Sequence, residues 1–104
     1  MGVDVAWVDA DHKPLQQVFD PKQNLTRLAS SRWPTLSGTV CLRFIDPFGD
    51  AVFNQAQIPE LVRELRQEIL VVSDAQTRAH LETVVRLIEK SISKVHTYIK
   101  FIGD

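Results

Sequence analysis

The sequence predicts a single α+β domain, residues 1–104, in which a mostly antiparallel sheet of four or five strands is covered on one face by a helix pair. Two observations predict it. Apolar side chains alternate with a period of two near the N-terminus, recur with a helical period between residues 58 and 95, and alternate again after His96. The length of 104 residues suits one domain, and an apolar fraction of 44% can fill one core. The expected order is strand, strand, short helix, strand, strand, helix, helix, strand.

The N-terminal third is expected to form a hairpin followed by a short helix. Apolar residues alternate over Val3–Trp7, and Leu15–Phe19 gives a second, less regular strand. Asp20-Pro21 then favours a helix start, because aspartate caps free N–H groups and proline fits the first helical position. Gln23 stands where a capping box places it. The helix is expected to end before Trp33-Pro34, since the residue before proline avoids the α conformation.

A second hairpin is expected at the centre of the sheet. Its strands are Val40–Ile45 and Ala51–Phe53. Three side chains of the first strand would share the core face: Val40, Leu42 and Phe44. The loop between the strands, Asp46–Asp50, reads Asp-Pro-Phe-Gly-Asp. Proline presets φ for a turn, aspartate binds its own backbone and glycine accepts a positive φ, so this composition is typical of a hairpin loop.

Two helices joined by a short turn are expected to follow and to cover the sheet. The first begins near Pro59, and its apolar residues from Ile58 to Ile69 have helical spacing. The pattern Ser73-Asp74-Ala75-Gln76 resembles a capping box and predicts a second helix over residues 74–95. Its apolar stripe runs from Leu81 to Val95.

Three glutamates repeat every four residues on a separate face of the first long helix: Glu60, Glu64 and Glu68. Like charges at this spacing repel one another by about 0.2–0.5 kcal/mol per pair. Two interpretations are open. The glutamates form an ordinary solvated face, or they form an acidic ridge that contacts a basic partner.

The last segment, Thr97–Ile102, is predicted to be a strand paired within the sheet, because an unpaired strand at this position would fray. Ile99 and Phe101 should face the core, and Tyr98 and Lys100 the opposite side.

Composition argues against several classes of function. The net charge of −1 does not favour nucleic acid as a partner, and no apolar run approaches the ~18 residues needed to span a membrane. No signal-peptide pattern is present, and a single cysteine, Cys41, cannot form an internal disulfide; both observations suit a cytoplasmic protein. Cys41 fits a buried apolar position better than a nucleophilic role. No glycine-rich phosphate loop and no zinc-ligand spacing occur, so no cofactor is expected.

Three carboxylates form the one constellation that suggests chemistry: Asp46, Asp50 and Asp104. If the last strand lies beside the central hairpin, they could converge on a divalent cation and support a small metal-dependent hydrolase. The turn-forming role of Asp46 and Asp50 already explains their presence. The three histidines are far apart in sequence and fit surface or packing positions better than catalytic ones.

Two segments carry a resemblance to a known family. Asp46–Asn54, with Gln57 three residues later, resembles the DPYGDTVFN signature of small, mostly uncharacterised bacterial proteins, and His96–Asp104 is similar to their HLYLKFIGD ending. This chain has Phe48 where tyrosine is usual and Ala51 where threonine is usual, so roles of those hydroxyl groups do not carry over.

Members of this family look like the immunity proteins that accompany polymorphic toxins. The resemblance implies a non-enzymatic cytoplasmic protein, a monomer or weak dimer, that binds a cognate toxin and occludes its active site. The contact residues expected here are those of the loop or of the acidic repeat: Asp46, Phe48, Asp50, Glu60, Glu64 and Glu68. A metal-dependent hydrolase and a subunit of a regulatory complex remain the alternatives.

Overall fold

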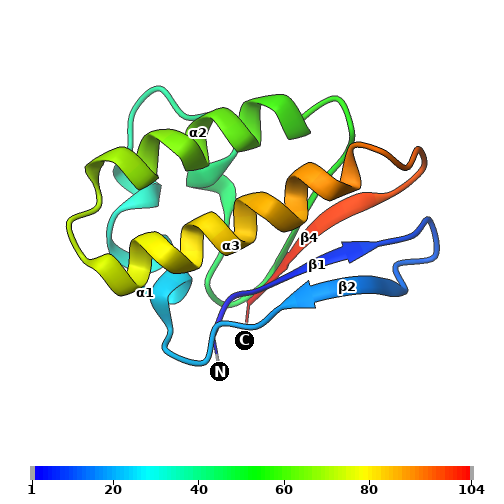
Figure 1. The fold of residues 1–104 in the computed structure, drawn as a ribbon. Coiled ribbons are helices and arrows are strands. Elements are labelled where there is room, and N and C mark those ends of the chain that lie inside the picture. The colour runs from blue at the N-terminus through cyan, green and yellow to red at the C-terminus, as the bar shows by residue number, and fades with distance from the viewer. Residues whose placement is uncertain (1, 104) are drawn as a thin grey trace.

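A four-stranded antiparallel sheet forms one layer of the computed structural model, which describes residues 2–103 (Figure 1). The strands are β1 (Asp4–Val8), β2 (Pro14–Val18), β3 (Asp50–Phe53) and β4 (Tyr98–Ile102). Their spatial order is β2-β1-β4-β3, and every neighbouring pair is antiparallel. The α+β class and the antiparallel sheet are therefore confirmed, with four strands.

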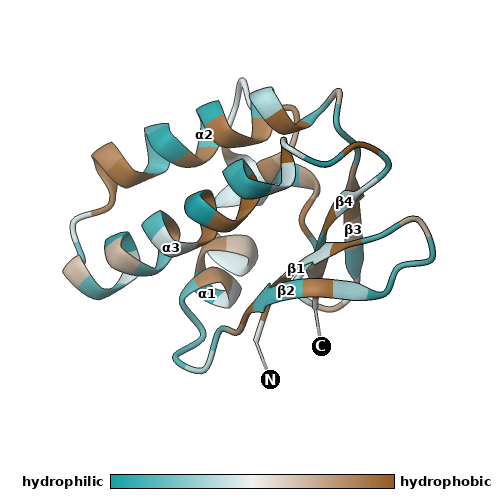
Figure 2. Ribbon diagram, turned by 45° about the vertical axis from the view of Figure 1, so that its right-hand side comes forward, coloured by the Kyte–Doolittle hydropathy of each residue, from teal (hydrophilic) through white to brown (hydrophobic). Residues whose placement is uncertain are grey.

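Three α-helices form the second layer: α1 (Asn24–Ser31), α2 (Ile58–Val71) and α3 (Ala75–Ser91). The long helices α2 and α3 run side by side in opposite directions and cover one face of the sheet (Figure 1). Apolar and polar residues alternate in bands along both helices, as expected of helices with one buried side (Figure 2). No helix within residues 2–103 is both long and apolar enough to cross a membrane.

The last strand, β4, lies inside the sheet between β1 and β3. Ile99 pairs with Phe53 on one side and with Trp7 on the other. Ile99 and Phe101 are fully buried, and the Phe101 ring meets Phe53 edge-on at 5.8 Å between ring centres. The predicted final strand and the inward direction of its two apolar side chains are confirmed.

The expected strand over Val40–Ile45 is wrong. This segment contains the short 3₁₀ turn η2 (Leu42–Phe44), and Val40 and Phe44, expected in the core, are exposed. The reason lies on α2. Three successive backbone N–H groups donate to the Glu64 carboxylate, at N–O distances of 2.6, 3.1 and 2.9 Å from Val40, Cys41 and Leu42. N–H groups satisfied in this way do not pair with a strand.

Without that strand, the predicted central hairpin does not form. β3 is instead an edge strand that pairs with β4, with Phe53 opposite Ile99. The loop Asp46–Asp50 leads from the η2 turn into this edge, rather than joining two strands of a hairpin.

The start of α1 also differs from the prediction. Asp20 does bind helical N–H groups, but the helix begins four residues later, at Asn24. One Asp20 oxygen accepts from the Asn24 N–H at 2.7 Å, and the other accepts from Leu25 at 3.1 Å. Gln23 has a left-handed conformation, with φ 57°, so the predicted capping box is wrong.

The second long helix begins one residue later and ends earlier than predicted. Asp74, rather than Ser73, is its N-cap, and α3 ends at Ser91 rather than near Val95. Val95 is exposed, in the turn that leads into β4.

Asp74 makes the stability of α3 depend on pH. Its carboxylate accepts hydrogen bonds from the Thr77 hydroxyl and backbone N–H, which lower the pKa of Asp74 below its usual range. A lowered folded-state pKa means that this stabilisation is complete above the unfolded pKa of about 3.9 and is lost as pH falls through the folded value.

Asp74→Asn keeps an acceptor oxygen but removes the titration. Thermal melts should show the wild-type chain more stable than the variant at neutral pH, with the difference shrinking below about pH 4. A difference of the same size at all pH values would contradict this role of the Asp74 charge.

Candidate interaction surface

The loop Asp46–Asp50 and the end of the chain, which together carry the family resemblance, lie against each other. The Gly103 N–H donates to the Gly49 carbonyl at 2.7 Å. A Cβ on Gly103 would lie only 2.6 Å from the carbonyl oxygens of Asp46 and Gly49. Glycine is needed at this position because the loop backbone approaches too closely for any side chain.

The loop is also fixed from within. One Asp46 carboxylate oxygen accepts from the Phe48 N–H at 2.8 Å, and the Asp46 carbonyl accepts from the Gly49 N–H at 3.3 Å. Phe48 stands between these contacts with 78% of its surface exposed. The loop therefore presents an aromatic side chain to solvent from a backbone held on both sides.

A charged pair lies beside the loop, on the sheet face turned away from the helices. The Lys100 ammonium is 3.6 Å from an Asp50 carboxylate oxygen, and Lys100 pairs across the strands with Val52. We use the name loop surface for Asp46, Phe48, Asp50, Val52 and Lys100. It joins three of the predicted contact residues to one side of the sheet.

The rest of the first signature segment has a structural role. Asn54 and Gln57 exchange hydrogen bonds at the start of α2, each accepting the other's backbone N–H at 2.9 and 3.1 Å. The Gln55 side chain donates to the carbonyls of Ser91 and Thr97. These contacts tie the beginning of α2 to the turn between α3 and β4.

The expected acidic face of α2 is wrong, because only Glu60 of the three glutamates is exposed. Glu68 is 2% exposed, and its carboxylate binds the Arg32 guanidinium at 2.8 and 2.9 Å and the Trp33 indole N–H at 2.7 Å. Glu64 is 4% exposed and holds the backbone of residues 40–42. Both carboxylates are engaged inside the chain and are not free for a partner.

Cys41 lies next to the buried Glu64 carboxylate. Burial, reinforced by the Glu64 charge, raises the pKa of the Cys41 thiol to about 11. The thiol is therefore protonated at neutral pH, and a protonated thiol is a poor nucleophile.

The carboxylates considered for a metal site have partners of their own. Asp46 binds the loop backbone and Asp50 lies beside Lys100. Within residues 2–103, no three His, Cys, Asp or Glu side chains are grouped so as to hold a metal ion. Asp104, the third predicted ligand, lies outside the described residues.

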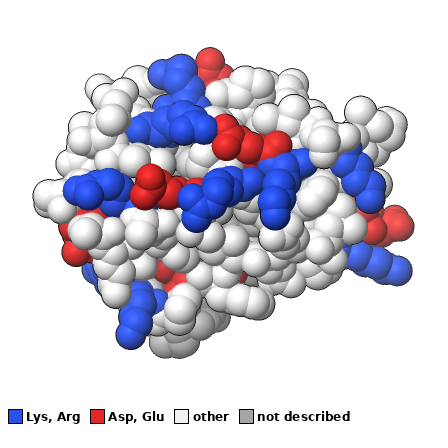
Figure 3. Space-filling view, viewed as in Figure 1, with Lys and Arg blue, Asp and Glu red and all other residues white. Residues whose placement is uncertain are grey.

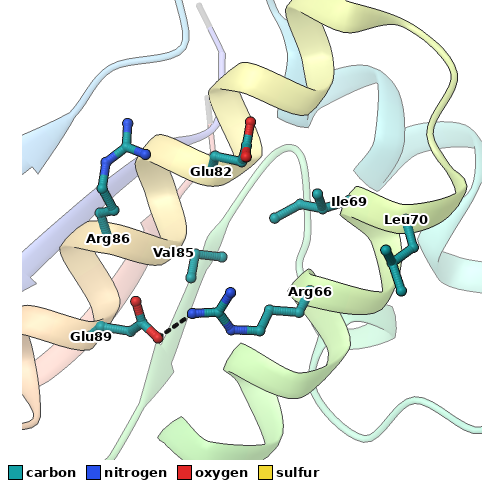
Figure 4. Close-up of a pocket in the computed structure, with 7 residues that line it drawn as sticks. All are labelled: Arg66, Ile69, Leu70, Glu82, Val85, Arg86 and Glu89. Carbon is teal, nitrogen blue, oxygen red and sulfur yellow. Dashed lines mark hydrogen bonds and ion pairs between the residues drawn. The ribbon is translucent and has the colours of Figure 1, made fainter.

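A groove of about 370 Å³ runs between α2 and α3 on the side away from the sheet (Figure 4). Its apolar residues are Ile69, Leu70 and Val85, and its charged residues are Arg66, Glu82, Arg86 and Glu89. An ion pair between Arg66 and Glu89 crosses it. Basic and acidic side chains lie interspersed over this helix face, rather than separated by sign (Figure 3).

The sequence pattern does not predict this groove. Leu70 lies in the last turn of α2, and its side chain is 78% exposed at the groove. Two apolar residues next to a helix end, Leu70 and Val71, were the available signal.

Comparisons with protein-family models, with curated proteins and with solved structures found no significant match to this chain.

Proposed function

We propose that this protein is an immunity-type protein of the bacterial cytoplasm that binds a cognate toxin and neutralises it by covering the toxin's active site with the loop surface. The observation that carries the proposal is the exposure of Phe48 on a loop fixed by Asp46 and by Gly103. The resemblance of the two segments that meet at this loop supplies the kind of partner.

An exposed aromatic side chain on a fixed loop suits protein binding. Fully burying a phenylalanine side chain is worth about 1.5–3 kcal/mol, and aromatic residues are enriched at the cores of interfaces. Ordering a mobile loop would subtract from this gain, but the hydrogen bonds within Asp46–Gly49 already hold the backbone. Phe48 therefore fits the role of an anchor that enters a pocket of the toxin.

The charges around Phe48 suit a basic active site. Asp46 and Asp50 flank the ring in the sequence, and Lys100 balances only one of them. Complementary fields raise association rates and disfavour wrong partners. A toxin whose active cleft is lined by lysine or arginine, as in enzymes acting on nucleic acid, would match this arrangement.

Co-expression with the product of the neighbouring gene tests the proposal. The wild-type protein should restore growth of cells that produce this toxin, and Phe48→Ala should lose protection because the anchor is removed. Phe19→Ala is the matched control, since Phe19 is also exposed but lies beyond β2, at the other edge of the sheet. It should protect as well as the wild type. Melting temperatures of all three proteins should agree.

Two outcomes count against the proposal. If the product of the neighbouring gene is harmless when produced alone, it is not a toxin and the proposed partner is absent. Full protection by Phe48→Ala places the contact elsewhere on the molecule.

A further inference from the structure

We infer that the groove between α2 and α3 is the interface of a symmetric dimer, in which a second copy of this chain lies across it. This association is separate from toxin binding. The helices form one layer, and Val52 and Lys100 of the loop surface lie on the sheet face turned away from them, so a dimer through the helices leaves that face free (Figure 1).

Apolar side chains at the groove favour coverage by protein. Leu70 is as exposed as Phe48, at 78%, and Val71 beside it is also exposed. Figure 2 shows this C-terminal end of α2 as an apolar segment. Ile69 and Val85 lie between the two helices, so a leucine from a second copy would meet apolar surface there (Figure 4). Burying Leu70 in this way removes apolar area from water.

The charges of the groove identify a second copy as the occupant. Two arginines and two glutamates line it, so their formal charges sum to zero and favour neither a basic nor an acidic partner. Arg66 and Glu89 satisfy each other across the groove. Glu82 and Arg86 do not pair with each other. Among residues 2–103, Glu82 makes no ion pair, and the Arg86 guanidinium donates to the Thr83 hydroxyl at 3.2 Å.

Glu82 and Arg86 are four residues apart on α3 and therefore lie on one face of the helix. A two-fold axis places residue i of one copy against residue j of the other, and j against i. If two α3 helices cross in opposite directions at residues 82–86, each Glu82 meets the Arg86 of the other copy. The face of α3 that carries these two opposite charges is therefore complementary to the same face of a second copy.

Charge reversal tests this pairing on the full-length chain by sedimentation equilibrium. The wild type should dimerise. Glu82→Arg and Arg86→Glu should each weaken the dimer at least about tenfold, because each places like charges together twice. The double variant, Glu82→Arg with Arg86→Glu, should restore the dimer. Asp11→Arg makes the same change of charge in the turn between β1 and β2 and should leave dimerisation unchanged.

Circular dichroism should show all four variants folded, since the substituted side chains are exposed. A wild-type chain that stays monomeric up to about 1 mM overturns the inference. A dimer that is insensitive to both single charge reversals also overturns the inference. The same holds if the double variant fails to restore the dimer. Loss of toxin protection by Glu82→Arg without a change in association would assign the groove to the toxin and overturn it as well.

Discussion

A chain that lacks Tyr98–Asp104 is expected to be unfolded. The deletion removes β4, which lies between β1 and β3, and leaves β3 without a strand partner. It also removes Ile99 and Phe101 from the core. Burying each of these side chains is worth about 1.5–3 kcal/mol, whereas a domain of this size has a total stability of about 5–15 kcal/mol. Circular dichroism should show loss of the cooperative thermal transition.

A chain that ends at Gly103 is the control for this truncation. It keeps β4 and the Gly103–Gly49 hydrogen bond, so it should melt close to the full-length protein. If the chain that lacks Tyr98–Asp104 shows a cooperative transition at the temperature of the full-length protein, β4 is not needed for the fold.

Among alanine substitutions of the three glutamates of α2, Glu64→Ala is expected to cause the largest loss of stability. The substitution leaves the apolar side chains of the core unchanged. The carboxylate accepts three backbone N–H groups, and those of Cys41 and Leu42 lie on buried residues. Leaving a buried donor unpaired costs about 1–3 kcal/mol. The free energy of unfolding in urea should therefore fall by about 2–5 kcal/mol, with the amides of residues 40–42 losing protection from hydrogen exchange.

Glu60→Ala is the matched control, four residues earlier on the same helix. Glu60 is exposed, and among residues 2–103 it forms an ion pair with Arg63 alone, a surface pair screened by solvent that contributes little to stability. Equal losses from the two substitutions would contradict the account of Glu64 as the residue that shapes residues 40–42.

The periodicity of the sequence was sufficient to predict the two layers. The helical stripe that includes Leu81 and Ile88 and the alternation around Ile99 both arise from local burial, and each is confirmed. The failure at Val40–Ile45 has a different origin. The conformation there depends on a carboxylate more than twenty residues away, and alternating apolar residues look the same whether or not their N–H groups pair with a strand. The four-residue spacing of Glu64 from Glu60 and Glu68 predicts an exposed position, whereas Glu64 is buried.

The candidate site was predicted only in part. The composition of Asp46–Asp50 identified a loop, but its contact with Gly103 depends on the register of β3 against β4, which pairs Asp50 with Ile102. Register between segments so distant in sequence is not a local property. The helix groove was missed for a related reason, because the exposure of Leu70 depends on how α2 and α3 pack.

Titrating the purified product of the neighbouring gene with this protein, and following the toxin's activity, tests the central claim most directly. The account predicts that the wild type and Phe19→Ala abolish the activity at one equivalent, and that Phe48→Ala needs at least about a tenfold higher concentration, as for loss of an interface anchor. A toxin that keeps full activity with the wild-type protein in excess would contradict the claim.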